Sequence, residues 1–197
     1  MRYINHMREQ REGADMVHTA ERPAAANPRF FRDVLAHNPT GVALVTAMQP
    51  DGTPVGMIVG TFVSVSLDPP LVAFLPGKSS TSWPKIREAG SFAVNVLSSE
   101  QSGLCRSFSK ASAQDKFAGI EWSRSERGNP ILDGCVAWVD CTVTTTHEAG
   151  DHEIVVGLVH DLAIERPAAP LVFFRGGFGE YADVAAASAT TVERKAG

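Results

Sequence analysis

The sequence predicts a mainly β protein with short helices, folded as a closed or nearly closed β-barrel. Short, apolar, β-rich runs recur along most of the chain and are separated by turn residues such as Asp51-Gly52, as is typical of barrels. Strands and helices do not alternate regularly enough for a doubly wound parallel sheet. With 197 residues, of which 44% are hydrophobic, the chain can bury one core, so a single domain is expected.

The ordered part of the chain is expected to span residues 27–181. Residues 1–26 are rich in charge and lack an apolar run, which predicts a flexible N-terminal extension, and residues 182–197 are interpreted as a C-terminal tail. Asn27 is suited to cap a helix that has Pro28 in its first turn. This helix should end near Asn38-Pro39, since a residue that precedes proline disfavours helical geometry.

Seven runs are predicted as strands because they are apolar and rich in β-branched or aromatic residues. They cover residues 41–47, 55–66, 71–75, 92–97, 136–146, 153–164 and 171–174. Asp51-Gly52 predicts a hairpin between the first two. A short helix is expected between Ser79 and Gly90, and a capping box at Ser98–Gln101 predicts another towards Phe108. Residues 111–133 look irregular, with a short helical piece at 115–117.

Composition excludes several classes of function. The chain has 18 basic and 22 acidic residues, a formal net charge of −4, and no dense basic cluster, so nucleic acid is not an expected partner. No apolar run reaches the roughly 18 residues of a membrane span, so no membrane association is expected. Cys105, Cys135 and Cys141 are odd in number and fit no metal spacing, which predicts buried, reduced thiols in a cytoplasmic protein without a metal site.

The stretch Lys78–Ser82 is the first candidate site. One cation and four hydroxyls precede a predicted helix, whose free N–H groups attract anions, so phosphate binding is chemically reasonable. A solvated loop with an ordinary helix cap explains the same residues, and from the residues alone it is the favoured interpretation.

The strand from Gly56 to Ser66 is the second candidate. Gly60 interrupts an apolar run in which Thr61, Ser64 and Ser66 supply hydroxyls, so a flat ring or a phosphate-bearing chain can approach the backbone there. A β-bulge with an exposed polar face is the equally plausible alternative.

The turn from His147 to Glu153 is the third candidate, because two histidines and three carboxylates surround it. A polar turn is a commoner explanation of these residues than a metal site, since the spacing of His147 and His152 is not that of a recognised ligand pair. His152 as a single functional imidazole is a further possibility. The chain lacks G-x-S-x-G, H-E-x-x-H and Gly-rich dinucleotide fingerprints, which argues against common hydrolases and Rossmann dehydrogenases.

Taken together, these segments resemble the flavin reductase family, the reductase components of two-component flavin-dependent monooxygenases, which have an FMN-binding split β-barrel fold. The resemblance covers about Phe30 to Tyr181 in collinear order. The stretches that carry it are Thr40–Val42, Val45–Thr46, Pro54–Met57, Ser64–Leu71, Lys78–Ser80, Ser82–Trp83, Phe92–Leu97, Asp115–Gly119, Pro130–Gly134 and Gly150–His152.

The resemblance implies roles for individual residues. The isoalloxazine and ribityl chain of FMN or FAD are expected along Met57, Ile58, Val59, Gly60 and Thr61, with Ser64 and Ser66. Lys78, Ser79 and Ser80 are expected near the flavin phosphate, and Asn95, Ser107 and Phe108 around the flavin. His152, with Asp151, is expected beside the nicotinamide. Many relatives carry polar residues at the positions of Ile58 and Gly60, so both FMN and FAD stay open.

The implied activity is reduction of FMN or FAD by NADH or NADPH, with reduced flavin supplied to a separate monooxygenase. Backbone N–H groups of residues 56–61 would stabilise negative charge on the flavin, and His152 would position the nicotinamide or relay a proton. A homodimer is expected. The alternatives are an oxidase or reductase that retains FMN and acts on another small molecule, and a non-catalytic flavin-binding or haem-binding module.

Overall fold

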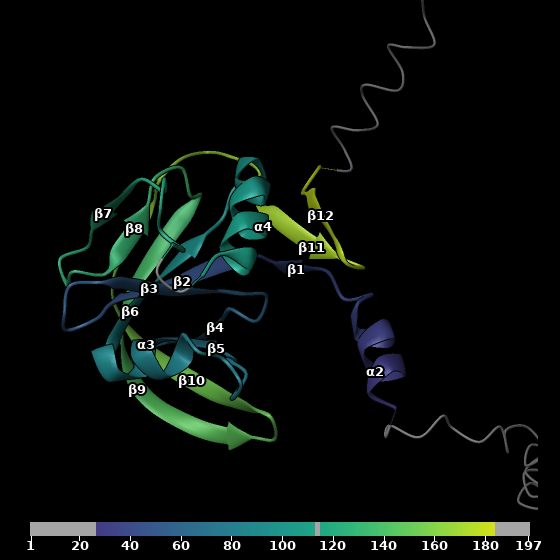
Figure 1. The fold of residues 1–197 in the computed structure, drawn as a ribbon, viewed down its shortest axis with the longest axis horizontal. Coiled ribbons are helices and arrows are strands. Elements are labelled where there is room, and N and C mark those ends of the chain that lie inside the picture. Colours follow the sequence, from purple (N-terminus) through teal and green to yellow (C-terminus); the bar gives the residue numbers. More distant parts are fainter. Residues whose placement is uncertain (1–26, 113–114, 184–197) are drawn as a thin grey trace, which may run out of the picture. The chain divides into compact units, whose positions relative to one another are not determined.

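β-Strands dominate the computed structural model, which describes residues 27–112 and 115–183 (Figure 1). The chain divides into two compact units between Asn38 and Pro39. Helix α2 (Pro28–Leu35) belongs to the first unit, and the described strands all belong to the second. The Asn27 side chain accepts hydrogen bonds from the backbone N of Arg29 at 3.0 Å and of Phe30 at 3.3 Å. The predicted helix start is therefore confirmed.

Seven antiparallel strands of the second unit form one sheet, in the order β3-β2-β6-β9-β10-β5-β4. The strands are β2 (Ala43–Met48), β3 (Pro54–Val59), β4 (Val63–Leu67), β5 (Pro70–Phe74), β6 (Ser91–Val96), β9 (Ala137–Ala149) and β10 (His152–Ile164). A second sheet consists of β1 (Thr40–Gly41), β11 (Leu171–Phe174) and β12 (Gly177–Glu180). Strands β7 (Trp122–Arg124) and β8 (Pro130–Leu132) form a separate two-stranded sheet.

The large sheet must curl into a barrel because its two edge strands are consecutive in the sequence. β3 and β4 lie at opposite edges, yet only residues 60–62 connect them. Seven strands in a flat sheet would place the edges about 29 Å apart. A three-residue connection spans at most roughly 14 Å. The edges therefore approach each other, as the predicted closed or nearly closed barrel requires.

Two helices cover the sheet on its two sides. Helix α3 (Trp83–Ala89) packs against β2, β3 and β6 (Figure 1). Its Trp83 and Ile86 are buried in the first hydrophobic cluster. Helix α4 (Ser102–Lys110) follows the 3₁₀ turn η1 (Ser99–Gln101) and buries Cys105 and Phe108 in a second hydrophobic cluster. β2 contributes side chains to both clusters, which explains why its sequence is continuously apolar rather than alternating.

Several local predictions are confirmed. The Asp51-Gly52 turn joins β2 and β3 with Met48 opposite Pro54, and Gly52 has the positive φ of 83° that favours glycine. Ser98 and Gln101 make the reciprocal hydrogen bonds of the capping box. Gly90 ends α3 in the left-handed conformation at φ 71°.

The predicted strand over residues 55–66 is wrong, because the chain leaves β3 at Gly60 and enters β4 at the opposite edge of the sheet. The break is stabilised by the Thr61 hydroxyl, which accepts a hydrogen bond from the backbone N of Leu75 at 3.0 Å. The strand predicted from Gly41 is also corrected, since β1 pairs with β11 and β2 begins only at Ala43. Strands β7, β8 and β12 were not predicted.

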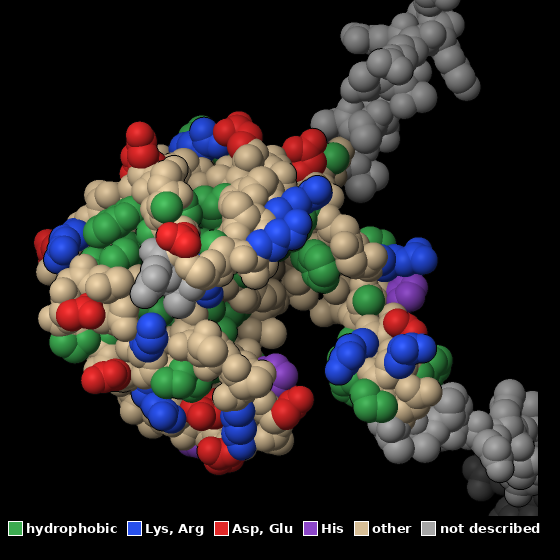
Figure 2. Space-filling model, in the orientation of Figure 1, with side chains coloured by type: hydrophobic (Ala, Val, Ile, Leu, Met, Phe, Trp, Pro, Cys, Tyr) green, Lys and Arg blue, Asp and Glu red, His purple; other side chains and the backbone are tan. Residues whose placement is uncertain are grey.

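The three cysteines are buried and unpaired, as predicted. Burial raises the pKa of Cys105 and Cys135 to about 11 and that of Cys141 to about 12. On the face shown in Figure 2, acidic and basic side chains are interspersed rather than gathered by sign. Within residues 27–112 and 115–183, no helix has the length and hydropathy needed to cross a membrane.

Candidate active site

Strand β3 presents an open backbone edge, since it pairs with β2 alone in the described part of the sheet. The carbonyl of Gly56 accepts a hydrogen bond from Lys116 Nζ at 3.4 Å, so the polar backbone groups of this residue point away from β2. Because the backbone groups of successive residues in an antiparallel strand point in alternating directions, the N–H and C=O of Ile58 also point away from β2. The segment predicted to contact flavin is therefore a strand edge whose backbone a ligand can approach.

The segment from Leu75 to Ser82 runs beside β3 in the opposite direction. At one end, Leu75 donates its backbone N–H to Thr61, just beyond β3. At the other end, Ser82 lies 3.2 Å from the ammonium of Lys116, which also contacts Gly56. Two segments that the sequence analysis singled out separately thus flank one region of the molecule.

The β9–β10 turn adjoins the same segment. Lys78 donates its backbone N–H to the carbonyl of Asp151 at 2.9 Å, and Gly77 forms a β-bridge with His152. The Lys78 ammonium is paired with the carboxylate of Glu148 on the turn. His152 is therefore held directly next to the segment that faces β3.

Asp151 fixes the orientation of the His152 ring. His152 Nδ1 lies 2.7 Å from Asp151 Oδ1, and an ionised carboxylate can only accept, so in the neutral ring Nδ1 carries the proton. Nε2 is then the free acceptor, and it lies on the side of Gly77, 3.6 Å from where a Cβ on that glycine would be. The His152 side chain is 47% exposed, so it is accessible to a ligand.

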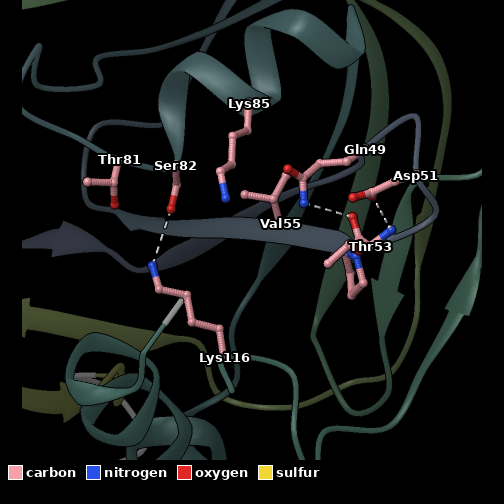
Figure 3. A pocket seen from close by; sticks show the side chains of 9 residues that line it. Gln49, Asp51, Thr53, Val55, Thr81, Ser82, Lys85 and Lys116 are labelled. Carbon is pink, nitrogen blue, oxygen red and sulfur yellow. Dashed lines mark hydrogen bonds between the residues drawn. The ribbon is translucent and has the colours of Figure 1, made fainter. Parts of the chain in front are cut away.

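A cavity of about 230 Å³ lies at the Pro54 end of β3. It is lined by Gln49, Asp51, Thr53, Pro54, Val55, Thr81, Ser82, Lys85 and Lys116. Figure 3 shows Lys85 extending from α3 with its ammonium beside Val55, and Lys116 reaching from the opposite side with its ammonium directed towards Ser82. Asp51 lies at the far end, where its carboxylate accepts a hydrogen bond from the backbone N of Thr53 at 2.8 Å.

A more apolar cavity, of about 210 Å³, lies at the Gly60 end of β3. Its walls are Thr40, Val42, Ile58, Val59, Gly60, Phe173 and Phe178, so three of the residues predicted to bind flavin line it. Phe173 and Phe178 are in edge contact, with ring centroids 5.5 Å apart. Apolar and aromatic walls with a single hydroxyl suit a flat, largely apolar ring.

Other predicted residues lie elsewhere. Ser64 and Ser66 are on edge strand β4 opposite Val72 and Leu71 of β5. Ser107 is exposed on α4, and its hydroxyl donates to the carbonyls of Gly103 and Leu104 within its own helix.

Phe108, on α4, lies against Gly56 of β3. A Cβ on Gly56 would lie 3.1 Å from its ring, so glycine at this position permits the close approach of β3 and α4.

Asn95 is fully buried on β6 and all its polar atoms are used within the protein. Its amide donates to the carbonyls of Leu44 at 3.2 Å and Pro130 at 3.3 Å, and to the hydroxyl of Thr46 at 3.1 Å. Its carbonyl accepts from the backbone N of Leu132 at 2.8 Å. In this structure Asn95 connects β2, β6 and β8 and has no surface to offer a ligand.

Sequence reasoning missed the two lysines of the larger cavity. The sequence assigned no role to either residue: Lys116 belongs to the stretch Asp115–Gly119 that carries the resemblance, and Lys85 to the helix predicted between Ser79 and Gly90. Neither lysine carried a local signal, because Lys85 is followed by Arg87 and Glu88, and Lys116 is directly preceded by Asp115. No group of three or more His, Cys, Asp or Glu side chains among residues 27–112 and 115–183 is arranged to hold a metal.

The fold defines a mainly β protein whose large sheet closes into a barrel, and comparison with known proteins identifies its family. Residues 35–182 match the model of the flavin reductase like domain. A flavin reductase of Pseudomonas putida is 53% identical over 161 residues, which are 82% of this chain and 94% of that protein. The reductase subunit HsaB of a flavin-dependent monooxygenase from Rhodococcus jostii is 45% identical, and the match covers 78% of each chain.

Solved structures agree. Component B of a nitrilotriacetate monooxygenase from Mycobacterium thermoresistibile superposes with a TM-score of 0.74 at 44% identity, and the match covers 78% of this chain and 86% of that one. The NADH:FAD oxidoreductase SgcE6 of Streptomyces globisporus, solved with NAD and FAD fragments, superposes with a TM-score of 0.75 at 32% identity. The match covers 81% of this chain and 95% of that one. The chain belongs to the flavin reductase family, and the predictions of a split-barrel fold and of an NAD(P)H-dependent flavin reductase are confirmed.

Proposed function

We propose that this protein reduces FMN or FAD with NADH or NADPH and releases the reduced flavin to a separate flavin-dependent monooxygenase. One observation carries the proposal: the open edge of β3 faces the segment 75–82, and His152 adjoins that segment. A monooxygenase partner is supported by one of the relatives, HsaB, which is the reductase subunit of a flavin-dependent monooxygenase. Three buried, unpaired thiols are typical of a reducing compartment, which supports a cytoplasmic location.

The flavin is placed along β3 with its ring towards Gly60 and Thr61. The strand is roughly 17 Å long by its six residues, a length comparable with that of an extended flavin mononucleotide. The apolar cavity lined by Ile58, Val59 and Gly60 suits the benzenoid part of the ring. Backbone N–H groups on the edge of β3 are suited to stabilise negative charge on the pyrimidine part.

When bound, the two cofactors supply the redox chemistry, a hydride passing from nicotinamide C4 to flavin N5. The protein then has to orient the two rings and keep the reacting atoms close. His152 performs this task for the nicotinamide, because Asp151 fixes its ring and leaves Nε2 directed towards Gly77 and the space beside it. Asp151 and His152 thus act together as the nicotinamide-binding pair.

Anaerobic mixing of the protein with NADH and catalytic FMN or FAD tests the activity. We expect the visible absorbance of the flavin to bleach, and the same mixture in air to oxidise NADH continuously. Protein that binds flavin but leaves it oxidised with both NADH and NADPH would contradict the proposal and favour a binding module. Flavin that stays bound through gel filtration after reduction would favour a reductase that retains its cofactor.

The exposed apolar side chains of edge strand β4, called the β4 face below, support a homodimer. Val63 and Val65 are each 52% exposed and Leu67 is 90% exposed, and a register shift between Ser64 and Ser66 lies at the centre of the strand. An apolar edge strand of this kind is usually covered in a native protein. A second copy related by two-fold symmetry would cover it and would bring β4, with Ser64 and Ser66, next to the partner.

Val65→Lys is expected to convert the dimer to a monomer, because it places a charge in the centre of the β4 face. Light scattering after gel filtration should give twice the chain mass for the wild type and the single-chain mass for the variant. Leu162→Lys on β10 is the matched control, since Leu162 is also exposed, at 61%, but lies outside the β4 face. A monomeric wild type at micromolar concentration would overturn the dimer.

A further inference from the structure

A third cavity, of about 300 Å³, lies between the β7–β8 turn and the β9–β10 ladder. It is lined by Glu126, Arg127, Asp140, His160 and Asp161, none of which belongs to the site along β3. Three of these five side chains are carboxylates and one is a guanidinium. The lining is therefore negative overall, which favours a cationic ligand.

A β-bulge gathers the acidic side chains of the two long strands. Val159 pairs with Cys141 and Asp161 with Asp140, so His160 is the extra residue of β10. Successive side chains of a regular strand face opposite sides, but the bulge lets both His160 and Asp161 line one cavity. Asp140 and Asp161 are directly opposite each other, a position in which like charges repel. A cation between the two carboxylates would replace this repulsion with attraction.

Asp140 is a buried carboxylate with one oxygen directed at the cavity. The residue is 1% exposed, and its Oδ1 accepts a hydrogen bond from Asn129 Nδ2 at 2.7 Å. Asn129 is also 1% exposed, and its own Oδ1 accepts from the hydroxyl of Ser91 at 3.3 Å. In the described part of the chain no hydrogen bond is made by Asp140 Oδ2, and the residue lines the cavity. Because buried charges in proteins are normally paired, this oxygen indicates a missing cation.

The other carboxylates and the guanidinium narrow the kind of cation. Among residues 27–112 and 115–183, no ion pair is made by Glu126, Asp140 or Asp161. The described side chains hold no group of three or more His, Cys, Asp or Glu arranged for a metal, and Arg127 in the same lining disfavours a bare divalent ion. A primary ammonium carries three N–H donors, which is one for each carboxylate.

We propose that this cavity binds small organic molecules that carry a primary ammonium group. Asp140 at the buried base and Asp161 opposite it accept the N–H donors from the strands, and Glu126 accepts from the β7–β8 turn. The volume of about 300 Å³ is that of a small-molecule site. The binding site is distinct from the reductase site and does not depend on the proposed function.

Isothermal titration of the full-length protein with n-butylammonium chloride, at constant ionic strength, tests the site. A dissociation constant of about 1 mM is expected, since a few charge-assisted contacts must offset the cost of association. Tetramethylammonium has the same charge and the same number of non-hydrogen atoms but no N–H donor. It should bind at least about tenfold more weakly, the effect of losing charge-assisted hydrogen bonds. Equal binding of the two cations would mean simple charge attraction and would overturn the proposal.

Asp140→Asn is the decisive variant, because asparagine keeps the size of the side chain and an acceptor for Asn129 but removes the charge. The affinity for n-butylammonium should fall about tenfold. Asp161→Asn alters an exposed residue without disturbing the buried base, and a loss of about threefold is expected because solvent screens that contact. Asp133→Asn, an exposed position outside the cavity, is the matched control and should bind as the wild type. Wild-type affinity in both cavity variants would overturn the site, and Asp161→Asn retains the test if Asp140→Asn fails to fold.

Two further titrations identify the source of the cation. Calcium chloride that displaces n-butylammonium at a lower concentration would assign the carboxylates to a metal ion and overturn the proposal. Nα-acetyl-lysine amide that binds tenfold more tightly than n-butylammonium would point to a lysine of a partner protein and would also overturn it. These titrations contain no flavin or NADH, so failure of the ammonium site leaves the reductase activity untouched, and the reverse also holds.

Discussion

Replacing His152 by asparagine is expected to lower kcat/KM for NADH about 100-fold, a loss typical of a group that orients a reactant or moves a proton. Asparagine removes Nε2, the acceptor that Asp151 leaves free on the side of Gly77. The proposed flavin site along β3 does not include His152, so the dissociation constant of the flavin should change less than twofold. Single-turnover reduction at saturating NADH separates loss of binding from loss of hydride transfer.

Two further variants sharpen this result. Asp151→Ala leaves the His152 ring in place but removes its partner at Nδ1, so an intermediate loss of about tenfold is expected from the poorer orientation. His147→Asn, on the same β9–β10 hairpin but opposite Ile154, is the control and should behave as the wild type. A loss in flavin affinity as large as that in NADH turnover would place His152 at the flavin rather than at the nicotinamide.

Elements with local signals were predictable from the sequence. Asn27 before Pro28, Asp51-Gly52 and the capping box at Ser98 each make their hydrogen bonds within three residues, and the structure contains all of them. The break at Gly60 is different, because it depends on Leu75, whose N–H binds Thr61 from 14 residues away. Nothing in residues 55–66 alone indicates that the chain must cross to the other edge of the sheet.

The same distinction applies to the site. The stretches around β3, Lys78 and His152 were recognised from local patterns and from resemblance, but their mutual arrangement was not. Lys78 is paired with Glu148 and Lys116 contacts Gly56, over sequence separations of 70 and 60 residues. Pairings at such separations follow from the order of strands in the sheet. Which lysine faces the cavity could therefore not be predicted without the fold.

Asn95→Ala is expected to destabilise the protein by about 3 kcal/mol, the sum of a lost hydrogen-bond network and a small void. The backbone N of Leu132 would lose its 2.8 Å acceptor in a region where Leu132 is 1% exposed. The link from β6 to Pro130 would also be lost. Urea denaturation should show a lower midpoint with an unchanged slope, because the native surface stays the same.

Two variants separate a structural role of Asn95 from a contact with flavin. Asn95→Asp keeps an acceptor for Leu132 but turns an ionised oxygen towards the carbonyls of Leu44 and Pro130, so stability should fall as pH rises through the ionisation of the new carboxyl. Ser107→Ala, which loses only bonds within α4, should stay within about 0.5 kcal/mol of the wild type. Because Asn95 has no exposed surface, the fraction of Asn95→Ala that remains folded should keep its KM for flavin within twofold. A tenfold rise in that KM with unchanged stability would show instead that the barrel opens around Asn95 when flavin binds.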